Sequence, residues 1–197
     1  MKVVVIGATG TIGSRIADEL ESRGVEVVHA GRSNGVDVTQ PASVATAVEG
    51  ADAVVSAVKV RDDSYTLAGV ARSLVDGLRR AGVRRLVIVG GAGSLEAAPG
   101  VRLVDTPEFE EEWKPEALDH ADALAFFRTV DDLDWTFVSP AAYIHPGERT
   151  GRYRVGGDQL LVDENGKSEV SAEDYAIAIA DVLEQASHPG ERITVAW

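Results

Sequence analysis

Hydrophobic residues follow two alternating patterns along this chain. Short β-branched runs, typical of buried strands, alternate with segments in which apolar residues recur every three or four positions, as on one face of a helix. The first strand-like run covers residues 3–6, and the first helix-like segment follows it with Ile12, Ile16 and Leu20. It predicts a strand, a tight turn and a helix over 11–23, ending at a glycine.

The same alternation continues to the C-terminus. Strands that alternate with helices of this length form parallel βαβ units with right-handed crossovers. We therefore expect an α/β fold, a doubly wound parallel sheet covered by helices on both faces. The further strands are predicted at residues 25–30, 35–39, 52–58, 84–90, 134–138 and 192–196, and the further helices at 41–48, 66–81, 115–130 and from 171 onward.

Two stretches depart from this alternation and are expected to cap a site. Residues 95–115 include a long loop at 99–115, and long loops in compact domains are often lids. Its acidic run at 110–112 has no histidine at ligand spacing, which favours a solvated face over a metal site. Residues 140–170 form the second stretch, and within it residues 147–166 are rich in glycine and charge and predict an irregular excursion with one or two short strands.

The start of the last helix resembles a capping box. Ser171 would cap the helix, and Asp174 stands where the second residue of the box is usually glutamate. Asp174 is therefore interpreted as structural. The residues Ala176, Ile179 and Leu183 have the spacing of an inward face.

Composition limits the possible partners. With 197 residues the chain is long enough for one well-buried core, so one domain spanning 1–197 is expected. Its net charge of -13, from 19 basic and 32 acidic residues, argues against nucleic acid or an anionic membrane as a partner. Without cysteine, neither a disulfide nor a thiolate site is possible. The strand pattern begins directly after residue 2, with no signal-peptide pattern, and no apolar run reaches membrane length, so a cytoplasmic location is expected.

The first turn carries the strongest chemical signal, three glycines at the spacing GxxGxxG. Gly7 would permit the turn, Gly10 would let the backbone approach a pyrophosphate, and Gly13 would let the helix pack closely on the strand. Free N–H groups at the helix start would face the anion. The alternative is an ordinary turn without a ligand. The predicted cofactor-binding residues here are Gly7, Thr9, Gly10, Thr11, Ile12 and Gly13.

The residues after the second strand would select the cofactor. An acid there binds the ribose of NAD, whereas an arginine accommodates the 2′-phosphate of NADP. Arg32 lies at this place and no acid occurs between residues 27 and 34, which favours NADPH, with NAD possible. The alternative is a solvated surface arginine. Asp37 and Val38 would lie near the adenine ring.

Three further segments are expected at the carboxyl edge of the sheet. Ala57 and Val58 would lie beside the cofactor. The glycines Gly90, Gly91 and Gly93 remove side chains from the edge, so that a flat ligand could lie there, although glycine clusters also form plain turns and Ser94 could bond its own backbone. Pro140 would end the sixth long strand and direct the chain over the edge. The predicted cofactor-binding residues at this edge are Ala57, Val58, Gly90, Gly91 and Pro140.

With these residues, the GGAGSL segment at 90–95, the PGERTG segment at 146–151 and Ser139-Pro140, the chain resembles the atypical short-chain dehydrogenase/reductases, specifically the NADH-flavin reductase group. The likeness covers the whole chain. It implies a Rossmann domain that binds NAD(P), with small C-terminal cap segments. Relatives of this group include biliverdin/flavin reductases and NmrA-like redox sensors.

One departure concerns the chemistry. Typical short-chain dehydrogenases use a Tyr-x-x-x-Lys pair, and none of the four tyrosines here has a lysine four residues on. A reduced flavin delocalises its charge and can be protonated by solvent, so the missing pair fits flavin reduction. The biliverdin/flavin reductases carry a histidine where this chain has Ala141-Ala142. The candidate catalytic residues are Ser94 and His145, the latter with the alternative of an exposed loop histidine.

Two functions remain open at this point. One is an NADPH-dependent reductase of a flat acceptor, with FMN or FAD as substrate rather than bound cofactor and the nicotinamide placed over residues 91–94. The other is an NADP-binding sensor without turnover, in which the cofactor orders 99–115 for a partner protein. The expected partner of the reductase is a small-molecule acceptor, and the protein is expected to be a monomer or small homo-oligomer without a metal.

Overall fold

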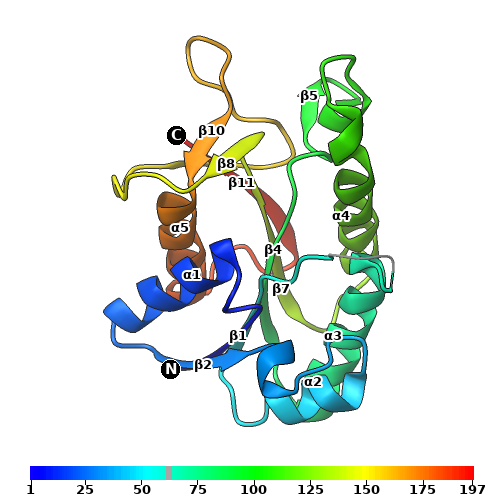
Figure 1. Ribbon diagram of the computed structural model, residues 1–197, viewed down its shortest axis with the longest axis vertical. Helices are drawn as coiled ribbons and strands as arrows, with labels where there is room; N and C mark the ends of the chain where they lie inside the picture. The colour runs from blue at the N-terminus through cyan, green and yellow to red at the C-terminus, as the bar shows by residue number, and fades with distance from the viewer. Residues whose placement is uncertain (61–63) are drawn as a thin grey trace.

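The computed structural model describes residues 1–60 and 64–197, which form a seven-stranded sheet between two helical layers (Figure 1). The strands are parallel except β9, and their order is β2-β1-β3-β4-β7-β11-β9. Helices α1 and α5 pack together on one face, and α2, α3 and α4 cover the other. The sheet consists of β1 (Lys2–Ile6), β2 (Glu26–Ala30), β3 (Ala53–Ser56), β4 (Arg85–Val89), β7 (Asp134–Pro140), β9 (Arg154–Gly156) and β11 (Glu191–Ala196), and the helices are α1 (Thr11–Ser22), α2 (Pro41–Ala47), α3 (Leu67–Ala81), α4 (Lys114–Phe127) and α5 (Ala172–Glu184).

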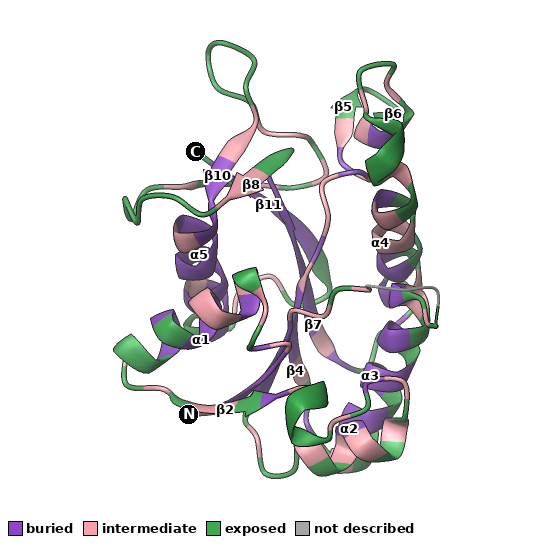
Figure 2. Ribbon diagram, in the orientation of Figure 1, coloured by how far each residue is buried: buried purple, intermediate pink, exposed green. Residues whose placement is uncertain are grey.

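The central strands are buried on both faces, as the purple strands of Figure 2 show. In β1, Val3 and Val5 contribute to the core beneath α1 and α5, whereas Val4 and Ile6 contribute to the core beneath α2, α3 and α4. Alternate side chains of a strand point to opposite faces. The continuous apolar runs of the sequence are therefore explained by two helical layers.

The predicted helices and the long strands are confirmed, with ends within a few residues. Helix α3 begins after Thr66, whose side chain accepts a hydrogen bond from the backbone N–H of Gly69, and ends at Gly82, whose φ is 72°. The closing strand β11 lies beside β7, and β7 ends at Pro140 as predicted.

The strand predicted at 35–39 was wrong. Gly35 has a φ of 83°, and the side chain of Asp37 accepts hydrogen bonds from the backbone and hydroxyl of Thr39. These contacts make a turn in which Val38 is buried in the core. Local side-chain bonds of this kind compete with strand pairing, and the alternation of Val36 and Val38 does not outweigh them.

The long loop predicted at 99–115 was also wrong in part. Strand β5 (Glu96–Ala98) pairs with β6 (Val101–Arg102), and two single 3₁₀ turns follow at Leu103–Asp105 and Glu111–Trp113. The buried residue Val104 bonds through its N–H to the carbonyl of Gly93. The segment is therefore tied to the glycine-rich turn after β4.

The excursion predicted at 147–166 contains one short strand, β9, as predicted, and two more short strands lie on either side of it. Beyond the end of β7, β8 (Tyr143–His145) pairs with β10 (Glu169–Ser171) (Figure 1). Strand β9 pairs with β11 and completes the edge of the main sheet. Ser171 caps α5 by accepting a bond from the N–H of Asp174, but the Asp174 carboxylate does not complete a capping box. It binds Thr150, Gly151 and Trp197 instead.

None of the helices in the described residues combines the length and hydrophobicity needed to cross a membrane.

Candidate functional site

The turn between β1 and α1 is built on two glycines that the fold itself requires. Gly7 has a φ of 87°, and a Cβ there would lie 2.5 Å from the carbonyl oxygen of Ala57. A Cβ on Gly13 would lie 2.1 Å from the carbonyl oxygen of Gly7. Both positions exclude a side chain because backbone atoms occupy its place, which agrees with the turn and packing roles expected of them.

Gly10 is different, since the protein alone gives no reason for a glycine there. Its φ of -81° suits any residue, and a Cβ would meet only the carbonyl oxygen of Gly7 at an ordinary 3.4 Å. The residue leaves open space directly in front of α1. Glycine at such a place lets a ligand approach the backbone closely.

The N-terminus of α1 has the properties of an anion site. No side chain caps it, and its first turn contains no acidic residue. Among the described residues, the backbone N–H groups of Thr11, Ile12 and Gly13 make no hydrogen bond to another backbone group. Unpaired N–H groups and the helix dipole together attract a phosphate. Thr9 is exposed beside them.

Arg32 lies just past the end of β2, on the side of β1 away from β3. It is exposed, and its guanidinium makes no ion pair or hydrogen bond to any residue that the structure describes. The strand order reverses at β1, and open α/β sheets bind ligands at such a switch point. A dinucleotide with its adenosine half at Arg32 and its pyrophosphate at α1 would therefore extend across the ends of β3 and β4.

Asp37 and Val38, which were expected near the adenine, both have structural roles in the turn at 35–39. The Asp37 carboxylate is held by Thr39, and these bonds lower its pKa. The Val38 side chain is buried in the core beneath α2 and α3, so a contact with a ligand would use its backbone.

The carboxyl ends of β3 and β4 lie side by side, as expected. The two glycines that follow β4, Gly90 and Gly91, have different surroundings. Ala57 bonds through its N–H to the carbonyl of Ile6, and Val58 is partly exposed after it. A Cβ on Gly90 would lie 2.2 Å from the ring of Phe137, so this glycine is required by core packing. A Cβ on Gly91 would lie 2.9 Å from the ring of His120.

Ser94 is held by a buried arginine. Its hydroxyl accepts a hydrogen bond from Nη1 of Arg192, at 3.3 Å, and the same nitrogen is 3.5 Å from the hydroxyl of Ser139. Arg192 is also ion-paired with Asp158, which Arg128 contacts at 2.9 Å. The sequence analysis missed Arg192, although a charge in the apolar strand β11 was a signal.

His145 is not linked to Ser94: among the described residues no hydrogen bond joins the two. Its Nε2 lies 2.8 Å from the carboxylate of Glu169 and its Nδ1 2.9 Å from the carbonyl oxygen of Pro146. The Pro146 carbonyl and Glu169 raise the pKa of His145. Both ring nitrogens thus serve the β8–β10 pair. Pro140 is buried at the end of β7.

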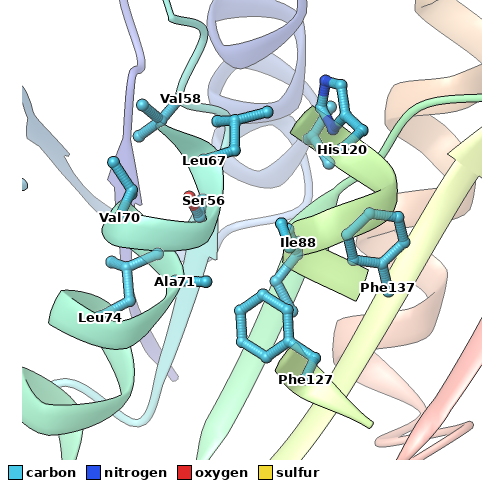
Figure 3. Close-up of a pocket in the computed structure, with 12 residues that line it drawn as sticks. Ser56, Val58, Leu67, Val70, Ala71, Leu74, Ile88, His120, Phe127 and Phe137 are labelled. Carbon is cyan, nitrogen blue, oxygen red and sulfur yellow. The ribbon is translucent and has the colours of Figure 1, made fainter. Parts of the chain in front are cut away.

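A second histidine, His120, was missed by the sequence analysis and lies at the predicted edge. It projects from α4 towards a cavity of about 20 Å³, room for one water molecule, between α3, α4 and the ends of β3 and β4 (Figure 3). The spacing from Ala117 to His120 and on to Leu124 places it on the inward face of α4, which was the available signal. The other residues that line this cavity are Ser56, Val58, Leu67, Val70, Ala71, Leu74, Ile88, Val89, Ala123, Phe127 and Phe137.

Known proteins share the whole of this architecture. A protein of Burkholderia pseudomallei, described as a "putative exported protein", is 48% identical, with a TM-score of 0.92 and all of both chains covered. A "putative epimerase" of Bacteroides thetaiotaomicron is 41% identical, with a TM-score of 0.91, covering 100% of this chain and 96% of its own. A "putative NADH-flavin reductase" of Streptococcus pneumoniae is 36% identical, with a TM-score of 0.86, covering 100% and 99%.

The sequence also matches the family described as NAD(P)H-binding over residues 7–186. This range begins at the first glycine of the turn and ends just after α5, so it includes the switch point and the ends of β3, β4 and β7. With its Rossmann-like sheet and a glycine turn that leads into an uncapped helix, the chain belongs to the NAD(P)H-binding family.

Proposed function

We propose that this protein is an NADPH-dependent reductase whose acceptor is a flat, electron-poor compound, such as FMN or FAD bound as a substrate. The observation that carries the proposal is Gly10, which the fold does not require and which leaves the N-terminus of α1 open to a pyrophosphate. NADPH would supply a hydride to the acceptor. The likeness to the Streptococcus pneumoniae protein described as a "putative NADH-flavin reductase" supports the choice of reaction.

The residues of this chain would act mainly by positioning. The N–H groups at the start of α1 would hold the pyrophosphate, and Arg32 the 2′-phosphate. The reacting rings would lie across the ends of β3 and β4, beside the ring of His120, which packs on Gly91. Holding two reactants in contact at the correct orientation can by itself remove a large part of a barrier.

The proposal is tested by following NADPH absorbance with a panel of flavins and quinones, against a protein-free control. We expect turnover with at least one flavin. NADPH binding without turnover across the panel would overturn the reductase and favour a dinucleotide-binding sensor.

Replacing Arg32 by alanine is expected to remove a preference for NADPH over NADH. A charge-assisted arginine–phosphate contact contributes about 1.5–3 kcal/mol, which corresponds to a roughly ten- to hundredfold difference in affinity. Titration of both cofactors into the wild type and the variant measures it. Equal dissociation constants in the wild type would show that Arg32 is a solvated surface residue.

Replacing Ser94 by alanine is expected to lower flavin turnover by no more than about tenfold. The hydroxyl is held by Arg192, and losing one hydrogen bond costs about 0.5–1.5 kcal/mol, whereas losing a general acid costs about 10²–10⁴ in rate. Steady-state kinetics of the wild type and the variant distinguish the loss of one hydrogen bond from the loss of a general acid. A thousandfold fall with unchanged NADPH affinity would make Ser94 part of a proton relay.

A further inference from the structure

The imidazole of His120 lies against the backbone of Gly91, at the end of β4. A Cβ on Gly91 would come within 2.9 Å of Cγ and Cδ2 and 3.0 Å of Cβ of the histidine, so the glycine is what allows the ring to lie there. The ring is partly buried, and neither nitrogen makes a hydrogen bond to any part of the chain that the structure describes. An imidazole at this sheet edge that has no hydrogen-bond partner among residues 1–60 and 64–197 can offer its hydrogen-bonding groups to a ligand.

The surroundings of His120 favour its neutral form. Burial lowers its pKa, and Lys59 lowers it further, while Glu116 and Asp119 act in the opposite direction. Both acids are engaged elsewhere: Glu116 pairs with Lys59 at 3.1 Å, and Asp119 accepts the backbone N–H of Leu67 at 2.8 Å. The side chains that α3 and β4 present to the cavity are apolar, and β3 adds only the hydroxyl of Ser56. A neutral imidazole keeps one N–H donor and one acceptor.

The position of His120 matches the reacting end of the dinucleotide. With the adenosine half near Arg32 and the pyrophosphate at α1, the nicotinamide half extends across β3 towards β4, which is the strand that His120 overlies. Figure 3 shows the histidine at one end of the lining, across from Val58 and Leu67. The cavity, at about 20 Å³, has room for only one water molecule, so an acceptor would lie across its mouth rather than inside it.

We propose, on the basis of the reductase function above, that His120 is a catalytic residue that contacts the acceptor. Its neutral N–H donates a hydrogen bond to a carbonyl oxygen of a flat conjugated acceptor, the class that includes isoalloxazines and quinones. Hydride delivery leaves a negative charge on such an acceptor, and a donor aimed at that charge lowers the barrier. Neutral imidazoles are known to polarise carbonyls in this way.

The step balances without a proton from the protein. The acceptor gains a hydrogen and two electrons as the C4–H bond of the dihydronicotinamide breaks and a bond to the acceptor forms; NADPH is oxidised to NADP⁺ and the acceptor is reduced to an anion. Water then supplies the proton that neutralises this anion. His120 keeps its own proton throughout and needs no acid partner, and neither ring nitrogen bonds to a carboxylate in the part of the chain that the structure describes.

Two variants separate a hydrogen-bond donor from a space-filling ring. His120→Leu keeps an apolar bulk but removes the donor, whereas His120→Gln keeps an N–H donor. We expect kcat with FMN and with a quinone to fall about 10²–10³-fold in His120→Leu and less than about tenfold in His120→Gln. The NADPH dissociation constant, from nucleotide fluorescence, should stay within about twofold in both.

The matched control is His29→Leu, since His29 is an exposed histidine of β2 that pairs with Glu21. It should leave kcat unchanged. Equal loss in the Leu and Gln variants, or no loss in either, would overturn the donor role. A tenfold rise in the NADPH dissociation constant of His120→Leu would assign the histidine to the cofactor rather than to the acceptor.

A binding measurement keeps this proposal separate from the proposed function. FMN binding to the protein–NADP⁺ complex is followed by flavin fluorescence, and we expect His120→Leu to weaken it by about three- to tenfold. If the wild type binds FMN through His120 without oxidising NADPH, the reductase is overturned and the contact stands. If turnover occurs equally in all variants, the reductase stands and the contact is overturned.

Discussion

A Gly10→Val variant should fold normally and lose dinucleotide affinity by at least about a hundredfold. The φ of -81° and ψ of 167° at this residue are extended backbone that suits valine, and the first side-chain atom meets only one ordinary contact. The same side chain would fill the space before the N–H groups of α1. Two hydrogen bonds to a charged phosphate are worth about 3–6 kcal/mol, or roughly 10²–10⁴ in affinity. Thermal unfolding and NADPH titration together measure the two effects.

Gly13→Ala, in the same turn, should affect stability, whereas Gly10→Val should affect only dinucleotide binding. The Cβ added by Gly13→Ala would lie 2.1 Å from the Gly7 carbonyl oxygen, so the turn must move and the fold itself is destabilised. We expect a lower unfolding temperature in Gly13→Ala and an unchanged one in Gly10→Val. If Gly10→Val bound NADPH with wild-type affinity, the pyrophosphate would not lie beside Gly10, and the proposed function would lose its main support.

Asp174→Ala should lower the free energy of unfolding by about 3–5 kcal/mol. The carboxylate is fully buried and accepts bonds from the hydroxyl of Thr150, the N–H of Gly151 and Nε1 of Trp197, at 2.5, 2.9 and 2.7 Å. Each donor left without its partner costs about 1–3 kcal/mol. Chemical denaturation measures the loss.

Asp18→Ala, at an exposed position of α1, is the control and should change stability by less than about 0.5 kcal/mol. If Asp174→Ala lowered the free energy of unfolding no more than this control does, the 147–156 segment would not be held through Asp174.

The same carboxylate predicts an acid dependence. Burial raises the pKa of Asp174, but the bonds from Thr150, Trp197 and Gly151 outweigh burial, so the pKa is below its usual value of 3.8. A lowered pKa means that the stabilisation is fully present above the unfolded pKa and is lost as the pH falls through the folded one. The stability difference between the wild type and Asp174→Asn should therefore be constant near neutral pH and narrow below about pH 4. A difference independent of pH down to pH 2 would contradict this.

The order of the long helices and strands, and the place of the glycine turn after β1, could be predicted from the amino-acid sequence. These features depend on local chemistry: β-branched runs, helical spacing, and glycines such as Gly7 and Gly82 at positive φ. Where local signals conflicted, as at 35–39, the pattern of apolar residues gave the wrong element, because the Asp37 side chain bonds the backbone two residues on.

The side chains that meet at the carboxyl edge of the sheet could not be predicted, because they come from distant parts of the chain and meet only in the folded protein. The tertiary structure brought Arg192 to Ser94 and left His145 bonded to Glu169, and it placed His120 on Gly91. The partners in the first of these pairs are 98 residues apart. Contacts over such separations depend on strand order and on the packing of α4 against the sheet, which no local pattern encodes. The sequence could therefore identify the residues that shape a turn, but not the distant side chains that the fold brings together at the carboxyl edge of the sheet.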